Sequence, residues 1–172
     1  FTEFDNPYLS DGDRSMNWGI DYSSDNSIWY TDGSFDTLWR FSIDDETYTA
    51  VTFPSSESGS LPQRLQIDGS NIFVNDFTGG KITVFDLVQD TEEVSYISIV
   101  NPIPEGFTGD FDIDQEGNLW YTAWVPDSTG FLAKFDYPQY IQDVNLFGTS
   151  SENYVEVFEF PKDLNTANGL TV

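Results

Sequence analysis

The stretch that decides the fold reads Phe111-Asp112-Ile113-Asp114, then Leu119-Trp120-Tyr121-Thr122, then Leu132-Ala133-Lys134-Phe135-Asp136, then Val155-Glu156-Val157-Phe158-Glu159-Phe160-Pro161. The same order of four short apolar segments occurs twice more, with Ile28-Trp29-Tyr30-Thr31 and Ile72-Phe73-Val74-Asn75 as the second segments. Trp29 and Phe73 are 44 residues apart, and Phe73 and Trp120 are 47 apart. A period in the forties with four short strands in each unit is typical of β-propeller blades.

The repeat divides the chain into three complete units and two fragments. We expect an all-β fold, a single partial β-propeller over residues 1–172 with about three complete four-stranded blades. The parts are a blade end at 1–5, blade A at 17–54, blade B at 62–102, blade C at 107–161 and the start of a next blade at 165–172. Because propellers typically have four to eight blades, we expect a segment of a larger, six- or seven-bladed ring. A longer chain or a partner would supply the remaining blades.

The composition is strongly acidic. The chain has 30 Asp and Glu against six Lys and Arg, which gives a formal net charge of −24. Such a surface repels nucleic acid and anionic membranes, and no apolar run approaches the ~20 residues that span a bilayer. Two interpretations of the charge stay open, a solvated exterior suited to salty surroundings and a specific cation-binding role. The absence of His and Cys removes the commonest general base and all thiolate chemistry.

The repeat unit resembles that of the streptogramin B lyase-like propellers, the virginiamycin B lyase type, which are similar to NHL-repeat and gluconolactonase/regucalcin propellers. The resemblance implies a ring of blades. It also implies that lyase chemistry, where present, depends on His and Glu around a divalent metal. This segment has no His. The acidic residue after the second segment appears as Asp32 and Asp76, whereas blade C has Ala123. No catalytic residue is therefore carried over.

The candidate binding residues lie where the innermost strands of the blades begin, because propeller ligands usually bind at the central channel. Alignment of the units places Trp18, Arg64, Asp110 and Asn168 at this channel mouth. Arg64 and Asp110 are charged where the other units have Gly. They predict either a structural ion pair across the channel or a polar or metal-binding site. The metal is unknown, with Ca²⁺ or another divalent cation as the open possibility.

Three other features carry weaker predictions. The segment from Asp112 to Gly117 resembles the start of an EF-hand loop, but its twelfth position is Ala123, so we interpret it as a hairpin turn. The acidic clusters at 11–13, 44–46 and 90–93 suit weak cation binding. The insertion at 137–153 predicts a short helix or a packed loop, and its exposed aromatic residues would be the contact for a partner.

The favoured functional interpretation is a non-catalytic propeller, extracellular or on the cell surface, most readily of an archaeon. It would act as an acidic interaction or structural scaffold that meets a protein or a surface polymer, or as a subunit of a larger assembly. The alternative is a metal-dependent lyase or lactonase-like enzyme whose active site lies in blades not present here. The repeated aromatic residues are expected to pack between blades, whereas Trp18 and Trp124 fall outside the repeated core positions and are candidates for channel-facing rings.

Overall fold

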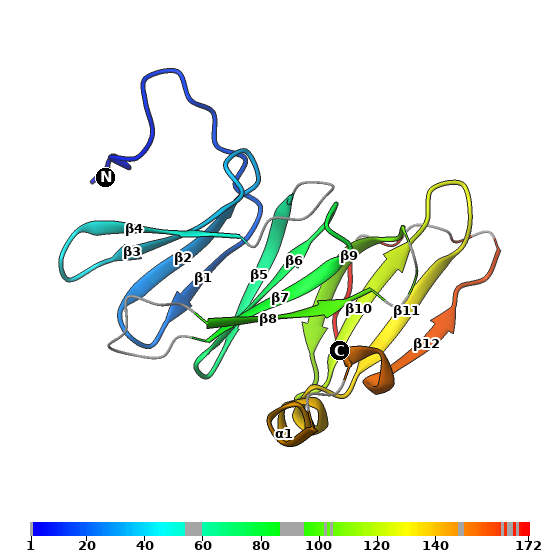
Figure 1. Ribbon diagram of the computed structural model, residues 1–172. Coiled ribbons are helices and arrows are strands. Elements are labelled where there is room, and N and C mark those ends of the chain that lie inside the picture. Colours follow the sequence, from blue (N-terminus) through cyan, green and yellow to red (C-terminus); the bar gives the residue numbers. More distant parts are fainter. Residues whose placement is uncertain are drawn as a thin grey trace.

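The computed structural model describes residues 2–53, 60–86, 95–101, 103, 105–147, 150–162, 164, 167 and 169–172. These residues form three four-stranded antiparallel sheets placed one beside the next (Figure 1). The structure therefore confirms the prediction of an all-β partial propeller. Within the described ranges, no helix is long and apolar enough to cross a membrane.

Each sheet is one blade, with its strands in chain order. Blade A contains β1 (Ile20–Ser23), β2 (Ser27–Asp32), β3 (Thr37–Ser42) and β4 (Thr47–Thr52). Blade B contains β5 (Pro62–Asp68), β6 (Asn71–Asp76), β7 (Lys81–Asp86) and β8 (Ser95–Val100). Blade C contains β9 (Phe107–Ile113), β10 (Leu119–Trp124), β11 (Gly130–Phe135) and β12 (Val155–Glu159). Its helix α1 (Tyr137–Phe147) and 3-10 helix η1 (Ser151–Tyr154) lie between β11 and β12.

The second and third strands are buried on both faces because neighbouring blades cover them. In β6, the five residues that follow Asn71 are all buried. Sheets covered on both faces read as nearly continuous apolar runs rather than as alternating ones, which explains sequences such as Ile72-Phe73-Val74. The first strands of neighbouring blades lie against one another, β1 against β5 and β5 against β9, so they form the inner edge of the structure.

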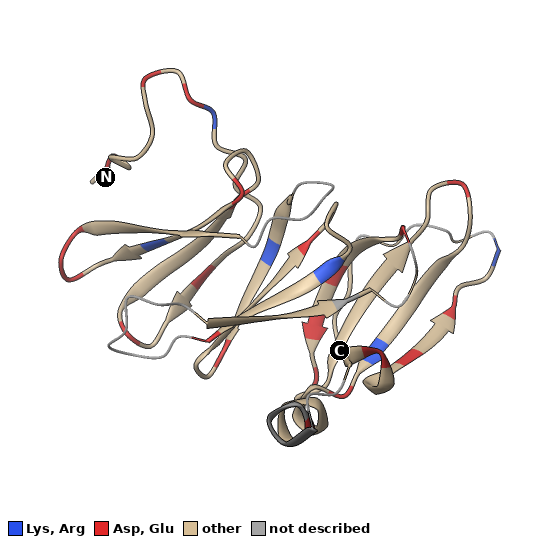
Figure 2. Ribbon diagram, viewed as in Figure 1, with Lys and Arg blue, Asp and Glu red and all other residues tan. Residues whose placement is uncertain are grey.

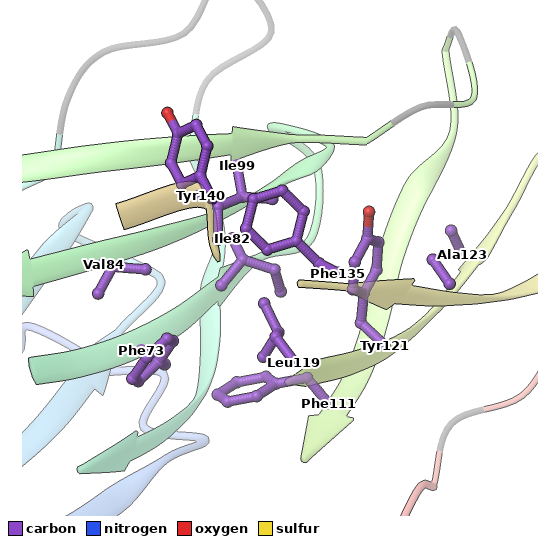
Figure 3. Close-up of a cluster of buried hydrophobic side chains, with 11 residues drawn as sticks. Phe73, Ile82, Val84, Ile99, Phe111, Leu119, Tyr121, Ala123, Phe135 and Tyr140 are labelled. Carbon is purple, nitrogen blue, oxygen red and sulfur yellow. The ribbon is translucent and has the colours of Figure 1, made fainter. Parts of the chain in front are cut away.

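Two apolar cores seal the blades together. The core between blades A and B consists of Trp29, Leu38, Phe53, Leu65, Ile72, Val74 and Phe85. The core between blades B and C is larger and is shown in Figure 3. It joins β6, β7 and β8 to blade C and includes Tyr140 of α1. The prediction that repeated aromatic residues pack between blades holds for Trp29, Phe73, Phe85 and Phe135.

The insertion in blade C differs in part from the expectation. It does form a helix, α1, but Tyr137 and Tyr140 pack against the core. Tyr140 is only 6% exposed and packs edge-on against Phe135, with ring centroids 5.2 Å apart. Tyr137 packs in the same way against Phe73 of blade B, at 5.0 Å. Tyr140 is therefore a core residue and not the exposed ring that we expected, whereas Tyr137 is half-buried and packs at the edge of the core between blades B and C. The contact of the insertion with a partner stays a prediction.

The outer face of blade A is partly covered by the N-terminal segment. Phe4 packs on Phe41 with ring centroids 5.0 Å apart, and Tyr8 packs on Trp39 at 5.3 Å. Trp39 is thus buried by this segment rather than by a neighbouring blade. Nearer the inner edge, the same face keeps Ile20 and other apolar side chains exposed.

A repeated hydrogen bond links each blade to the next. The second strand of each blade carries a buried polar side chain that donates to a backbone carbonyl of the following first strand. Thr31 donates to Gln63, Asn75 donates to Gly109 at 2.6 Å, and Thr122 donates to Ala167 at 2.8 Å. Two first strands add a carboxylate link of the same kind, from Asp21 to the N–H of Ile67 and from Asp112 to the N–H of Val172. Ala167 and residues 169–172 therefore lie where a next first strand would begin.

Candidate functional site

The first strands meet at a pocket at the channel mouth. It has a volume of about 470 Å³ and is open to solvent. It is formed where β5 and β9 begin, where β6 and β10 end, and by the residue that precedes Gly19. The side chains that line it are Trp18, Gln63, Arg64, Asn75, Phe77, Asp110 and Trp124.

Arg64 and Asp110 form an ion pair across this mouth. Arg64 Nη1 lies 2.8 Å from Asp110 Oδ1 and 2.9 Å from Oδ2. The backbone N–H groups of Phe111 and Leu170 also donate to the Asp110 carboxylate, each at 3.0 Å. The guanidinium carbon of Arg64 lies 5.9 Å from the centre of the Phe111 ring. These contacts fix the positions of both side chains, and the charge of Arg64 neutralises that of Asp110.

Asn75 supplies a polar atom without a partner. Its amide nitrogen donates to Gly109, but its Oδ1 is buried and accepts no hydrogen bond from the described residues. The side chain is 1% exposed and lines the pocket. A buried acceptor without a donor costs free energy, so this oxygen marks a place where a ligand donor group or a water would be stabilised.

Aromatic rings form the apolar part of the pocket. Phe77 stacks on Phe107 with ring centroids 4.9 Å apart and an interplanar angle of 6°, and Trp124 meets Phe77 edge-on at 5.6 Å. Trp18 also lines the pocket and is 60% exposed. Gly109 permits the close packing here, because a Cβ at this position would lie 2.5 Å from the Trp124 ring.

Three of the four predicted site residues come together in this pocket: Trp18, Arg64 and Asp110. The fourth, Asn168, lies outside the described residues. Trp18 and Trp124, the two candidates for channel-facing rings, both line the pocket. The prediction missed Gln63, Asn75 and Phe77. Asn75 replaces the Thr found at the same register in blades A and C, and this departure from the repeat was the available signal.

The described residues do not assemble a metal-binding group. No cluster of three or more Asp and Glu that could hold a metal ion occurs among them. Asp110 is the one carboxylate that lines the pocket, and its oxygens already accept from Arg64 and two backbone N–H groups. The acidic cluster predicted at 90–93 lies outside the part of the chain that the structure describes.

Asp32 and Asp76 are structural groups. Both are fully buried. Asp32 accepts from the N–H groups of Met16 and Ser34 and from Trp39 Nε1. Asp76 accepts in the same way from the N–H of Leu61, which precedes β5, and from the N–H of Gly79, which follows β6. Lys81 Nζ lies 4.0 Å from the Asp76 carboxylate. They fasten the loop before each blade to the hairpin after the second strand.

The EF-hand-like segment is a turn, as predicted. Asp114 accepts hydrogen bonds from the backbone N–H groups of Glu116 and Asn118 and from Trp120 Nε1, the last at 2.8 Å. Burial alone would raise the pKa of Asp114, but the hydrogen bonds from Trp120, Asn118 and Glu116 together lower it to about 2. Its carboxylate thus organises the hairpin between β9 and β10.

Comparisons with known proteins support the fold. No protein-family model and no curated protein matches the sequence. Among solved structures, a streptogramin B lyase is 14% identical with a TM-score of 0.61, over 85% of this chain and 40% of its own. Virginiamycin B lyase from Staphylococcus aureus is 13% identical with a TM-score of 0.58, over 84% and 40%. A candidate 6-phosphogluconolactonase from Bacteroides uniformis is 17% identical with a TM-score of 0.56, over 72% and 38%.

These likenesses confirm the resemblance to streptogramin B lyase-like propellers at the level of fold. This chain spans about 40% of the length of the lyases. At this identity, the likeness extends to the backbone and not to the residues of any active site. The chain is similar in fold to enzymes of the lyase and lactonase kinds, and it is a partial propeller with a pocket at its channel mouth.

Proposed function

We propose that this protein is a non-catalytic binding propeller whose channel mouth holds an uncharged, hydrogen-bonding ligand, such as a sugar unit of a surface polymer. The observation that carries the proposal is the pocket itself. It combines three aromatic rings with the unpaired Oδ1 of Asn75 and the side chain of Gln63. Binding sites typically pair apolar walls with a few convergent polar groups.

The charges of the pocket favour an uncharged ligand. Arg64 and Asp110 neutralise each other, so neither offers a free charge to an ion. The net charge of −24 repels anions at a distance. Aromatic faces suit the C–H faces of a sugar ring, while its hydroxyls suit Asn75, Gln63 and the remaining donors of Arg64.

The same charge underlies the proposed location and role. An acidic exterior keeps a protein soluble in salty surroundings, which supports an extracellular or cell-surface position and the role of an interaction scaffold. The acidic side chains are spread over all three blades, and Lys and Arg are few (Figure 2). The archaeal source remains part of this proposal.

Calorimetric titration of the full-length protein with maltotriose, cellotriose and triacetylchitotriose tests the proposed ligand class. We expect at least one of these neutral trisaccharides to bind. Trp18→Ala should weaken binding roughly tenfold, since aromatic side chains that become covered on binding carry much of the binding energy. The matched control is Tyr22→Ala, which removes an aromatic side chain that is about as exposed as Trp18 but lies in β1, outside the pocket. Absence of binding by all three sugars, or equal loss in both variants, would contradict the proposal.

Cation binding is tested separately, by titration with calcium. Because the Asp110 oxygens are occupied, we expect Asp110→Asn to leave any calcium affinity unchanged. A clear loss of calcium affinity in this variant would instead place a divalent cation at the channel mouth.

The second candidate function is a metal-dependent lyase or lactonase-like enzyme. The fold likeness to streptogramin B lyase favours it, and its active site would lie in blades beyond this chain. The full-length protein, incubated with Mg²⁺ and either a streptogramin B or a sugar lactone, should leave both unchanged if the first proposal is right. Ring opening that stops on addition of a chelator would favour the enzyme.

A further inference from the structure

A second depression lies at the opposite ends of the strands from the channel mouth. It is a groove of about 620 Å³ between blade B and helix α1. Blade B contributes the turn between β5 and β6, the end of β7 and the start of β8. Blade C contributes the turn between β9 and β10 and the first half of α1. The groove therefore follows the seam between two blades (Figure 1).

The walls of the groove are apolar and firmly held. Val84 and Ile97 line it from blade B, and Tyr137 and Pro138 line it from α1. The Tyr137 ring is fixed by its edge-on contact with Phe73 in the core below. At the rim, Tyr96 is 51% exposed. The groove thus offers a rigid apolar surface beside a solvent-exposed ring.

Two carboxylates that have no hydrogen-bond or ion-pair partner among the described residues flank this surface. Asp68, at the end of β5, and Asp86, at the end of β7, both line the groove. No described residue gives either carboxylate a hydrogen bond or an ion pair, and no Lys or Arg lines the groove. Burial, together with the negative charges of Asp86 and Asp68, raises the pKa of Tyr137 to about 12. Both carboxylates therefore act on the same ring.

Three of the six basic residues lie beside carboxylates outside the groove. Arg40 pairs with Asp25, Arg64 pairs with Asp110, and Lys81 lies near Asp76. With six bases against 30 acids, a second copy of this chain has little positive charge to place in the groove. Charge complementarity thus points to a different molecule.

We propose that this groove is a docking site for a basic segment of a partner protein. The aliphatic stem of a Lys or Arg side chain lies on the apolar walls, since long basic side chains bury their stems and keep their charged ends in polar surroundings. The charged end meets Asp68 and Asp86. A bare metal ion is a poor occupant, because no group of three or more carboxylates that could hold one occurs among the described residues, and divalent cations prefer oxygen ligands on all sides. This site is separate from the channel mouth and does not depend on the function proposed there.

The test is fluorescence anisotropy with the full-length protein and a labelled hexapeptide of alternating lysine and leucine, at 150 mM salt. The control peptide has the same sequence with every lysine acetylated. We expect the lysine peptide to bind and the acetylated peptide to bind at least about tenfold more weakly. Equal binding of the two peptides would overturn the proposal.

Matched protein variants separate the groove from general attraction to an acidic surface. Asp68→Asn with Asp86→Asn should weaken binding about tenfold, since it removes the charges that the groove contributes. Glu156→Gln with Glu159→Gln removes the same charge from exposed positions of β12 and should change binding by less than about twofold. Equal losses in the two double variants would overturn the proposal.

The apolar part of the site distinguishes a polypeptide from a small polyamine. Tyr96→Ala should weaken binding of the peptide about threefold, because it removes the exposed ring at the rim. Spermidine should displace the peptide only at large excess. Displacement by an equal concentration of spermidine would show a simple polyamine site and contradict docking of a protein segment.

Discussion

Blade A and blade C have the same four strands, but their second strands end differently. In blade A the strand ends in Asp32, a buried carboxylate that holds the loop before the blade and the hairpin after it. In blade C the same register is Ala123, and it is followed by Trp124, which lines the channel-mouth pocket. Blade A uses the position to hold its backbone, whereas blade C has Ala there and an aromatic ring one residue later.

The beginnings of the first strands also differ between blade A and blade C, with a backbone contact in one and a pocket side chain in the other. Gly19 of blade A approaches β5 so closely that a Cβ would lie 2.5 Å from the Gln63 carbonyl oxygen. The equivalent residue of blade C is Asp110, which pairs with Arg64. The residues that repeat between blades are thus those that hold blades together, and the departures from the repeat gather at the pocket.

The largest expected effect concerns the fastening carboxylate of blade A. Asp32→Ala leaves the N–H groups of Met16 and Ser34 without their acceptor. We expect it to lower the free energy of unfolding by roughly 3 kcal/mol, since each buried unpaired group costs about 1–3 kcal/mol. Urea denaturation measures this. A loss under about 1 kcal/mol would mean that blade A, like blade C, does not need a carboxylate there.

A smaller effect is expected where the two blades are alike. Thr31→Val and Thr122→Val each remove a hydrogen bond to the following first strand while keeping the side-chain volume. Each should lower the free energy of unfolding by about 1 to 3 kcal/mol, and the two losses should be similar. Denaturant titrations of both variants decide this. A cost at one Thr alone would show that the two links are not equivalent.

The smallest expected effect is the pH dependence that arises from Asp114, in the turn between β9 and β10 of blade C. The pKa of Asp114 is about 2 in the folded chain and about 3.9 in an unfolded one. The folded state therefore binds this proton less well, and the stabilising effect is present above about pH 4 and is lost as the pH falls toward 2. Asp114→Asn should make the melting temperature depend less steeply on pH across this window. An unchanged slope would contradict the hydrogen bonding described for this turn.

The sequence repeat predicts the strands well because each strand is a local pattern of apolar residues bounded by turn residues. It also places Trp18, Arg64 and Asp110 at one mouth, since equivalent positions of successive blades lie side by side. It does not predict the inward packing of Tyr137 and Tyr140, because an insertion has no counterpart in the other units. The sequence repeat does not predict the role of Asn75 either, for a related reason. Its partner Gly109 is 34 residues away, and no spacing rule connects them.

The most direct test of the channel-mouth site uses the five tryptophans of this chain. Two of them, Trp18 and Trp124, line the pocket, whereas Trp29, Trp39 and Trp120 lie elsewhere. With fluorinated tryptophan incorporated, ¹⁹F NMR should show the signals of Trp18 and Trp124 moving as a bound neutral trisaccharide is added, with the other three unchanged. Shifts confined to the other three signals, or no shift at saturating sugar, would contradict a binding site at the channel mouth.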